Sequence, residues 1–149
     1  MHPTILNEGS KRVSLRYGET SLVKTLDLQK PLKTHGARQI YCRVELEAGD
    51  QVSRGTVFLT APRFMNLPRA AIFTEVEAIS ACEFEITVQS EGFHHQVDLG
   101  ISGIPHKLDD NFFDLYPATP YRVRIRTETP TTAIQPRQAL CPYSLTNTY

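Results

Sequence analysis

Three stretches of the chain alternate apolar and polar residues with a period of two. Even positions are apolar in residues 40–47, and residues 82–89 and 121–126 repeat the alternation. Because neighbouring side chains on a strand point to opposite faces, each stretch predicts a strand with one buried and one solvated face. Such strands are typical of antiparallel sheets.

Seven further segments are predicted as strands from weaker alternation and from the turn residues around them. They are residues 11–17, 21–28, 52–60, 72–79, 93–101, 111–116 and 139–146. Turns are predicted around Gly18, Gly49 and Gly92 and at residues 116–120. The ten prolines leave little room for long helices. Short strands at this spacing predict an all-β protein with an immunoglobulin-like antiparallel β-sandwich.

A connector divides the chain into two parts. Pro62 and Pro68 flank a short stretch without alternation, which is typical of a semi-rigid linker. We therefore expect domain residues 1–61, a linker at 62–68 and a complete sandwich over 69–149. The strands predicted in residues 1–61 form only part of a second β-sandwich, with unpaired edges. Either they join the second sheet system, or the other strands of their sandwich lie upstream.

Charge and hydropathy exclude several partners. The chain of 149 residues has 16 basic and 16 acidic side chains and so no net charge, which removes the electrostatic footprint expected of a nucleic-acid or anionic-membrane binder. The charge is uneven: residues 1–67 hold ten basic and six acidic residues, and the remainder holds six and ten. We find neither a run of about 18 apolar residues nor a signal peptide at residues 1–8, and the compartment stays open.

Cysteines and histidines predict no metal or redox site. Cys42, Cys82 and Cys141 are far apart and odd in number, so they are interpreted as structural thiols. The neighbours His94 and His95 should point to opposite faces of a strand and therefore cannot share one ion. We expect no cofactor, because phosphate-binding glycine motifs are also absent from the sequence.

The densest carboxylate group precedes the segment 111–116. Asp109 and Asp110 are adjacent, and Asn111 and Asp114 follow without the glycine that a calcium loop requires. Because Asp and Asn favour turns, this group predicts a turn leading into a strand. Weak ion binding is the alternative, and a catalytic role has no supporting motif.

Two surface patterns have alternative interpretations. Arg122, Arg124 and Arg126 share one face of a predicted strand; they either protect a sheet edge from aggregation or form an anion surface. The aromatic residues Phe112, Phe113 and Tyr116 could contact a carbohydrate, although a strand with one buried face explains them equally well. No catalytic residue is predicted from the sequence.

Residues 17–28, 52–63, 110–117 and 144–149, taken in order, resemble segments in the C-terminal immunoglobulin-like domains of beta-mannosidases in glycoside hydrolase family 2. Residues 110–117, Asp-Asn-Phe-Phe-Asp-Leu-Tyr-Pro, resemble a segment of the last domain, and residues 52–63 with Leu67-Pro68 look like the junction between the last two sandwiches. Residues 17–28 are similar to late strands of the penultimate sandwich. The ending Ser-Leu-Thr-Asn-Thr-Tyr, residues 144–149, looks like the C-terminus of the family.

The resemblance implies a non-catalytic C-terminal portion of a beta-mannosidase-like enzyme that hydrolyses terminal beta-D-mannose residues. A related exo-acting hydrolase, such as an exo-glucosaminidase, is the nearest alternative within the family. The implied partners are the upstream catalytic barrel and sandwich domains of the parent chain, with a mannose-containing glycan as a further partner. The rival interpretation is a free-standing carbohydrate- or protein-binding sandwich that uses Phe112, Phe113 or Tyr116.

Overall fold

The computed structural model describes residues 4–14 and 16–147. Three parts of the predictions lie outside the described residues. They are residues 1–3 of the predicted domain 1–61, residue 15 of the predicted strand 11–17, and residues 148–149, which end both the predicted domain 69–149 and the motif at 144–149. The elements in chain order are α1 (Gln29–His35), β1 (Tyr41–Ala48), β2 (Gln51–Phe58), η1 (Pro62–Phe64), β3 (Ile72–Ala78), β4 (Glu83–Ser90), β5 (His94–Val97), β6 (His106–Leu108), β7 (Phe113–Leu115), β8 (Tyr121–Thr127), α2 (Ile134–Ala139) and η2 (Leu145–Asn147). All paired strands are antiparallel, which confirms the predicted all-β class.

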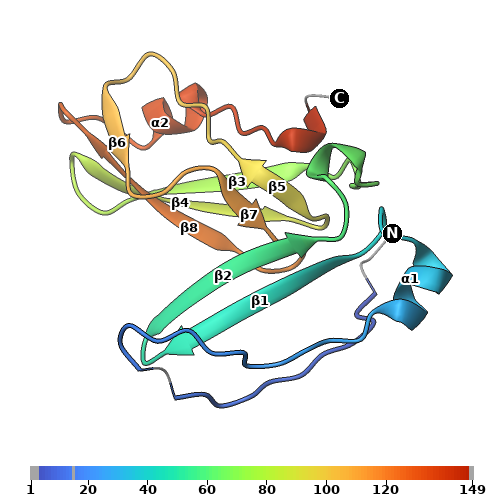
Figure 1. Cartoon of the computed structure of the whole chain (residues 1–149). Coiled ribbons are helices and arrows are strands. Elements are labelled where there is room, and N and C mark those ends of the chain that lie inside the picture. Colours follow the sequence, from blue (N-terminus) through green and yellow to red (C-terminus); the bar gives the residue numbers. More distant parts are fainter. Residues whose placement is uncertain (1–3, 15, 148–149) are drawn as a thin grey trace.

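A sandwich of two sheets forms the second part of the chain (Figure 1). One sheet has the order β3-β4-β8-β6, and the other pairs β5 with β7. Alternate side chains of β4 and β8 point inward, and Phe84, Ile86, Val88, Val123 and Ile125 are fully buried. Val97, Leu99 and Leu115 of the facing layer complete the same core. The alternation in residues 82–89 and 121–126 therefore predicted the buried faces correctly.

The arginine stripe of β8 lies on the outward face of the four-stranded sheet. Arg122 pairs with Glu85 at 3.6 Å, and Arg126 pairs with Glu83 at 3.3 Å. The interpretation as protection of a sheet edge is wrong, because β8 lies between β4 and β6. Strand β6 was missed because it is only three residues long.

A separate hairpin, β1–β2, projects from the sandwich (Figure 1). Ala48 pairs with Gln51, so the turn contains only Gly49 and Asp50. Gly49 has a φ of 60°, a left-handed conformation that favours glycine in a two-residue hairpin turn. The predicted turn and its two flanking strands are thus confirmed.

The N-terminal segment differs from the prediction. Among the described residues, neither 11–17 nor 21–28 forms a strand. Alternation alone does not make a strand, because its N–H and C=O groups need a partner strand. Residues 29–35 instead form the unpredicted helix α1, in which Pro31 occupies the first turn and needs no hydrogen-bond donor. No described helix is long and apolar enough to cross a membrane.

The C-terminal segment also departs from the predicted strand at 139–146. Helix α2 ends at Ala139, and the following residues form isolated bridges from Leu140 to Ile101 and from Tyr143 to Asp98. Pro142 lacks the N–H group that a continuous ladder would require. The segment therefore closes the two-stranded sheet without becoming a full strand.

Connector residues pack against the hairpin's base. The predicted linker at 62–68 contains η1, and Arg38 Nε donates to the Phe64 carbonyl at 2.6 Å. The Asn66 N–H in turn donates to the Arg38 carbonyl at 2.8 Å. These two bonds hold the connector to the residues just before β1.

Candidate functional site

The inward face of the hairpin meets the sandwich through an aromatic cluster. Tyr41 of β1 stacks on Phe93 with ring centroids 4.3 Å apart, and Phe58 of β2 meets His95 edge-on at 4.8 Å. Tyr116 packs against Phe93 at 5.4 Å. Because aromatic rings contribute large contact areas, this cluster anchors the hairpin to β5 and to the loop after β7.

Asp114 links the β5–β7 sheet to the hairpin at this junction. His95 Nδ1–H donates to its carboxylate at 2.7 Å, and the Gln96 N–H donates at 3.1 Å. Thr56 of β2 donates a third hydrogen bond to the carboxylate. Since the Thr56 proton goes to Asp114, the Tyr116 hydroxyl, 2.6 Å away, donates to Thr56 Oγ1. One threonine thus connects the hairpin to two side chains of the sandwich.

Burial at the junction raises the pKa of both tyrosines. Desolvation by burial raises the pKa of Tyr116 above 10.0, and the nearby negative charge of Asp114 adds to the shift. Tyr41 is shifted in the same direction, also by burial first. The Arg43 guanidinium lies over the Tyr116 ring at 4.4 Å. Both phenols are therefore neutral hydrogen-bonding groups at physiological pH and do not serve as bases.

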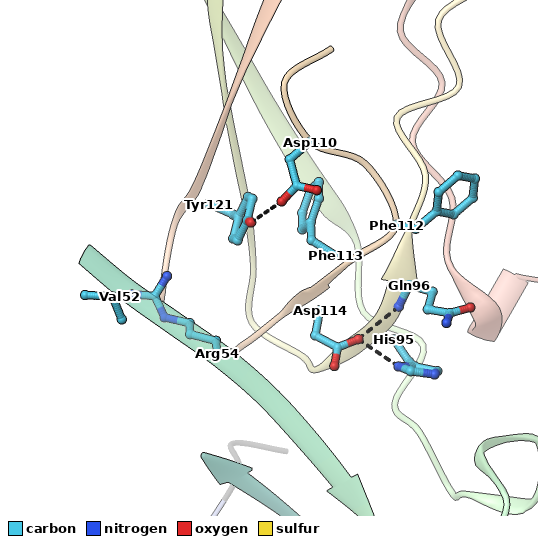
Figure 2. Close-up of a pocket in the computed structure, with 9 residues that line it drawn as sticks. All are labelled: Val52, Arg54, His95, Gln96, Asp110, Phe112, Phe113, Asp114 and Tyr121. Carbon is cyan, nitrogen blue, oxygen red and sulfur yellow. Dashed lines mark hydrogen bonds and ion pairs between the residues drawn. The ribbon is translucent and has the colours of Figure 1, made fainter. Parts of the chain in front are cut away.

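A polar groove opens beside this junction (Figure 2). Arg54 and Val52 of β2 form one wall, while Asp110, Asp114 and Tyr121 face them from the sandwich. The hollow has a volume of about 350 Å³. An adjoining hollow of about 530 Å³ shares Arg54 and Tyr121 with it and is completed by Pro120 and Arg122.

Charged groups of both signs line the groove. Arg54 Nε pairs with Glu45 at 2.7 Å. Tyr121 donates to Asp110, which lies beside it on the sandwich wall. Burial, followed by the hydrogen bond to Asp110, raises the pKa of Tyr121 to about 12. The tyrosine is thus a donor held in place by a carboxylate, and the groove has no activated nucleophile among its described side chains.

The three aromatic residues predicted to contact a carbohydrate lie in different places. Phe113 is 7% exposed and stacks on Tyr121 with ring centroids 4.1 Å apart and planes 4° apart. Phe112 is 62% exposed, and its ring points away from Asp110 and Tyr121 in Figure 2. Tyr116 is buried at the junction. The structure thus brings Phe112 and Phe113 to the groove and leaves Tyr116 outside it.

The adjacent histidines point to opposite sides of β5, as predicted. His94 is buried, and its Nε2–H donates to Ser90 Oγ at 3.0 Å because the Ser90 proton goes to the Ala71 carbonyl. Its Nδ1 lies 2.9 Å from Ser144 Oγ, which donates to it. Burial lowers the pKa of His94. His95 faces the junction instead, and no cluster of three metal-ligating side chains occurs among residues 4–14 and 16–147.

The acidic segment leads into β7 as predicted, through bends at Asp109 and Phe112. Asp109 accepts from the Arg124 N–H at 2.8 Å, and Asn111 accepts from the Leu99 N–H at 3.0 Å. Phe112 follows with a φ of 60°.

The sequence did not indicate Arg54, Thr56 and Tyr121 as site residues. Only the pairing of residues 52–60 with residues 40–47 could have indicated which side of β2 faces the sandwich.

The three thiols are free, and their exposure differs. Cys42 and Cys82 are half-buried, whereas Cys141 is exposed. The predicted structural role thus has support in packing for the first two cysteines. Packing does not support a structural role for Cys141, because this side chain is exposed.

Comparison with known protein families gives a match over the sandwich. Residues 67–148 match a family model described as an Ig-fold domain. This match covers the sandwich and begins within the connector, so the predicted immunoglobulin-like fold is confirmed there. No curated protein matches the chain.

Proposed function

Because the chain belongs to the family of Ig-fold domains of the kind found in beta-mannosidases, we propose that it is a non-catalytic C-terminal portion of a beta-mannosidase-like glycoside hydrolase. The parent enzyme hydrolyses terminal beta-D-mannose residues, and its catalytic barrel lies upstream of these residues. The family match over residues 67–148 is the observation that carries this proposal.

The outward face of the hairpin supports an upstream partner. Its alternate positions carry Val44, Leu46 and Val57, which are 55%, 45% and 52% exposed. An isolated two-stranded hairpin is marginally stable in water, and an apolar face of this kind is normally covered. We therefore propose that residues 1–61 complete a sandwich whose remaining strands belong to the upstream part of the parent chain.

Contacts at the junction support a role in holding domains together. Tyr41, Thr56 and Phe58 attach the hairpin to the sandwich through rings and hydrogen bonds. A sandwich fixed to its neighbour in this way supports a catalytic barrel as one rigid unit. The site residues described above are structural in this proposal, and none of them performs hydrolysis.

An immunoblot of the source cells tests the parent chain. Antibodies against residues 69–149 should detect a protein much larger than the 16.8 kDa of this chain. The larger protein, captured with the same antibodies, should hydrolyse a nitrophenyl beta-mannoside. A single band at the mass of this chain would contradict the proposal.

An assay of the isolated chain tests the non-catalytic role. Rigorously purified chain should give no hydrolysis of the nitrophenyl beta-mannoside above the rate without protein. Hydrolysis that follows this chain through successive purification steps would overturn the assignment. A beta-mannosidase with its own barrel serves as the positive control.

A further inference from the structure

We propose that the groove between β2 and the sandwich binds a neutral saccharide chain. This inference goes beyond the proposed function and does not depend on it, because it concerns a binding site built from this chain alone. The groove is the trough defined above, in which the two hollows meet at Arg54 and Tyr121. Their volumes of about 350 and 530 Å³ lie in the range of ligand sites, about 300–1,000 Å³.

The charges of the groove favour a neutral ligand. Arg54 and Arg122 are cationic, while Asp110 and Asp114 are anionic. An anion such as a nucleic acid would meet the two carboxylates, and a cation would meet the two guanidinium groups. A hydroxyl group can accept a hydrogen bond from a guanidinium group and donate one to a carboxylate. A polyhydroxylated molecule therefore satisfies both signs at once.

Hydrogen-bonding capacity remains on these side chains. A carboxylate accepts about four hydrogen bonds. Asp110 uses two, from Tyr121 and the Asn111 N–H, and Asp114 uses three. Arg54, which lines both hollows, bonds to Glu45 through its Nε and not through its terminal nitrogens. The internal bonds thus orient the side chains without saturating them.

Tyr121 supplies an aromatic surface where the hollows meet. Its ring is held flat by the parallel ring of Phe113 and by the hydrogen bond to Asp110. An aromatic ring with a polar end suits a ligand that has an apolar face and hydroxyl groups around its edge, as a sugar ring has. Tyr121 therefore replaces the three aromatic residues predicted from the sequence as the main stacking residue.

Backbone strain marks the same groove. Gln96 and Phe112 have φ values of 50° and 60°, and both line the smaller hollow. A left-handed conformation is unfavourable for residues other than glycine, and strained residues of this kind cluster at functional sites. In Figure 2 Gln96 lies beside Asp114, whereas the ring of Phe112 lies further away and points out of the groove. Two of the three left-handed residues other than glycine among the described residues therefore line the smaller hollow, and the third, Ala118, lies outside it.

Titration of the full chain with defined oligosaccharides tests the inference. Mannopentaose and cellopentaose are the neutral probes, and penta-galacturonate is the anionic one, each followed by amide chemical shifts to the solubility limit. We expect saturable shifts at groove residues with at least one neutral probe. Arg54→Ala and Asp110→Asn should each weaken that binding about tenfold, since each removes a charge-assisted hydrogen bond.

Arg126→Ala is the matched control, because it also breaks one arginine–glutamate pair on a strand but lies outside the groove. It should leave the affinity unchanged. The inference is overturned if neither neutral probe binds saturably, if penta-galacturonate binds more tightly, or if Arg126→Ala weakens binding as much as Arg54→Ala. Each of these results leaves the proposal about the parent enzyme standing.

Discussion

Thr56 of the hairpin donates a hydrogen bond to the carboxylate of Asp114 in the sandwich, 58 residues further along the chain. The same hydroxyl accepts from Tyr116. This contact places β2 against the β5–β7 sheet and so creates both the junction and one wall of the groove. The two parts of the chain are therefore held by polar contacts as well as by aromatic packing.

Removing the Thr56 hydroxyl should destabilise the protein. Thr56→Val keeps the shape of the side chain but leaves Asp114 and Tyr116 each without one partner. We expect the free energy of unfolding to fall by about 1–3 kcal/mol, measured by urea denaturation. Ser53→Ala, which removes an exposed hydroxyl from the same strand, should change it by less than about 0.5 kcal/mol. Equal effects of the two substitutions would contradict the role of Thr56.

The same substitution at two phenylalanines separates the core from the surface. Phe84 is fully buried between the sheets, whereas Phe73 on the adjacent strand is 55% exposed. Phe84→Ala should lower the free energy of unfolding by about 3–5 kcal/mol, because it leaves a cavity. Phe73→Ala should cost less than about 1 kcal/mol. Thermal unfolding followed by circular dichroism measures both losses. A larger loss of stability for Phe73→Ala would contradict the position of the core between the two sheets.

Protonation of His94 should weaken the fold in mild acid. Burial lowers its pKa below the ordinary 6.5, so the unfolded state binds the proton more readily than the folded state. The contribution to stability is therefore complete above pH 6.5 and is lost as the pH falls below it. The loss is at most about 1.4 kcal/mol per pH unit.

Urea denaturation between pH 5 and pH 8 measures this dependence. His94→Gln should flatten the slope below pH 6.5, whatever its effect on absolute stability, because glutamine does not titrate. Asp98 does not contribute in this range, since hydrogen bonds from Tyr143, Asn111 and Gly100 outweigh its burial and hold its pKa below 3.8. An unchanged slope in His94→Gln would assign the dependence to another group.

Two glycines with similar backbone angles distinguish strain from collision. Gly100 and Gly103 have φ values of 53° and 75°, so alanine at either position costs about 1–2 kcal/mol. A Cβ atom at Gly100 would also lie 2.5 Å from the Cys141 carbonyl oxygen, whereas one at Gly103 meets nothing within 4 Å. Gly100→Ala should therefore be the more destabilising substitution in urea denaturation. Equal losses would mean that the segment around Cys141 moves aside freely.

Local patterns predicted the centre of the sandwich better than its periphery. Residues 82–89 and 121–126 alternate clearly, and Phe84 and Ile125 are buried as expected. Residues 21–28 alternate weakly and form no strand, because no neighbouring segment pairs with them in the described structure. At 139–146, Pro142 prevents a continuous ladder although the flanking residues are apolar. Strand formation thus depended on a partner that the local pattern does not contain.

The candidate site was harder to predict than the fold. The aromatic residues Phe112 and Phe113 stand together in the sequence, but their rings take different environments because Phe112 adopts a left-handed backbone. Arg54 and Tyr121 are far apart in the chain, and each looks like an ordinary strand residue. Only the register of β1 with β2 and the packing of the hairpin bring them to one groove.

By itself, the sequence determined the all-β class, the main buried faces and the turn at Gly49, because these depend on side-chain alternation and on the backbone freedom of single residues. The tertiary structure decided which strands acquire partners, where the hairpin docks and which polar groups face one another. Those outcomes depend on contacts such as Thr56 with Asp114, between residues distant in the chain. Local periodicity specifies which face of a strand is apolar, but the identity of the surface that meets it is settled by packing.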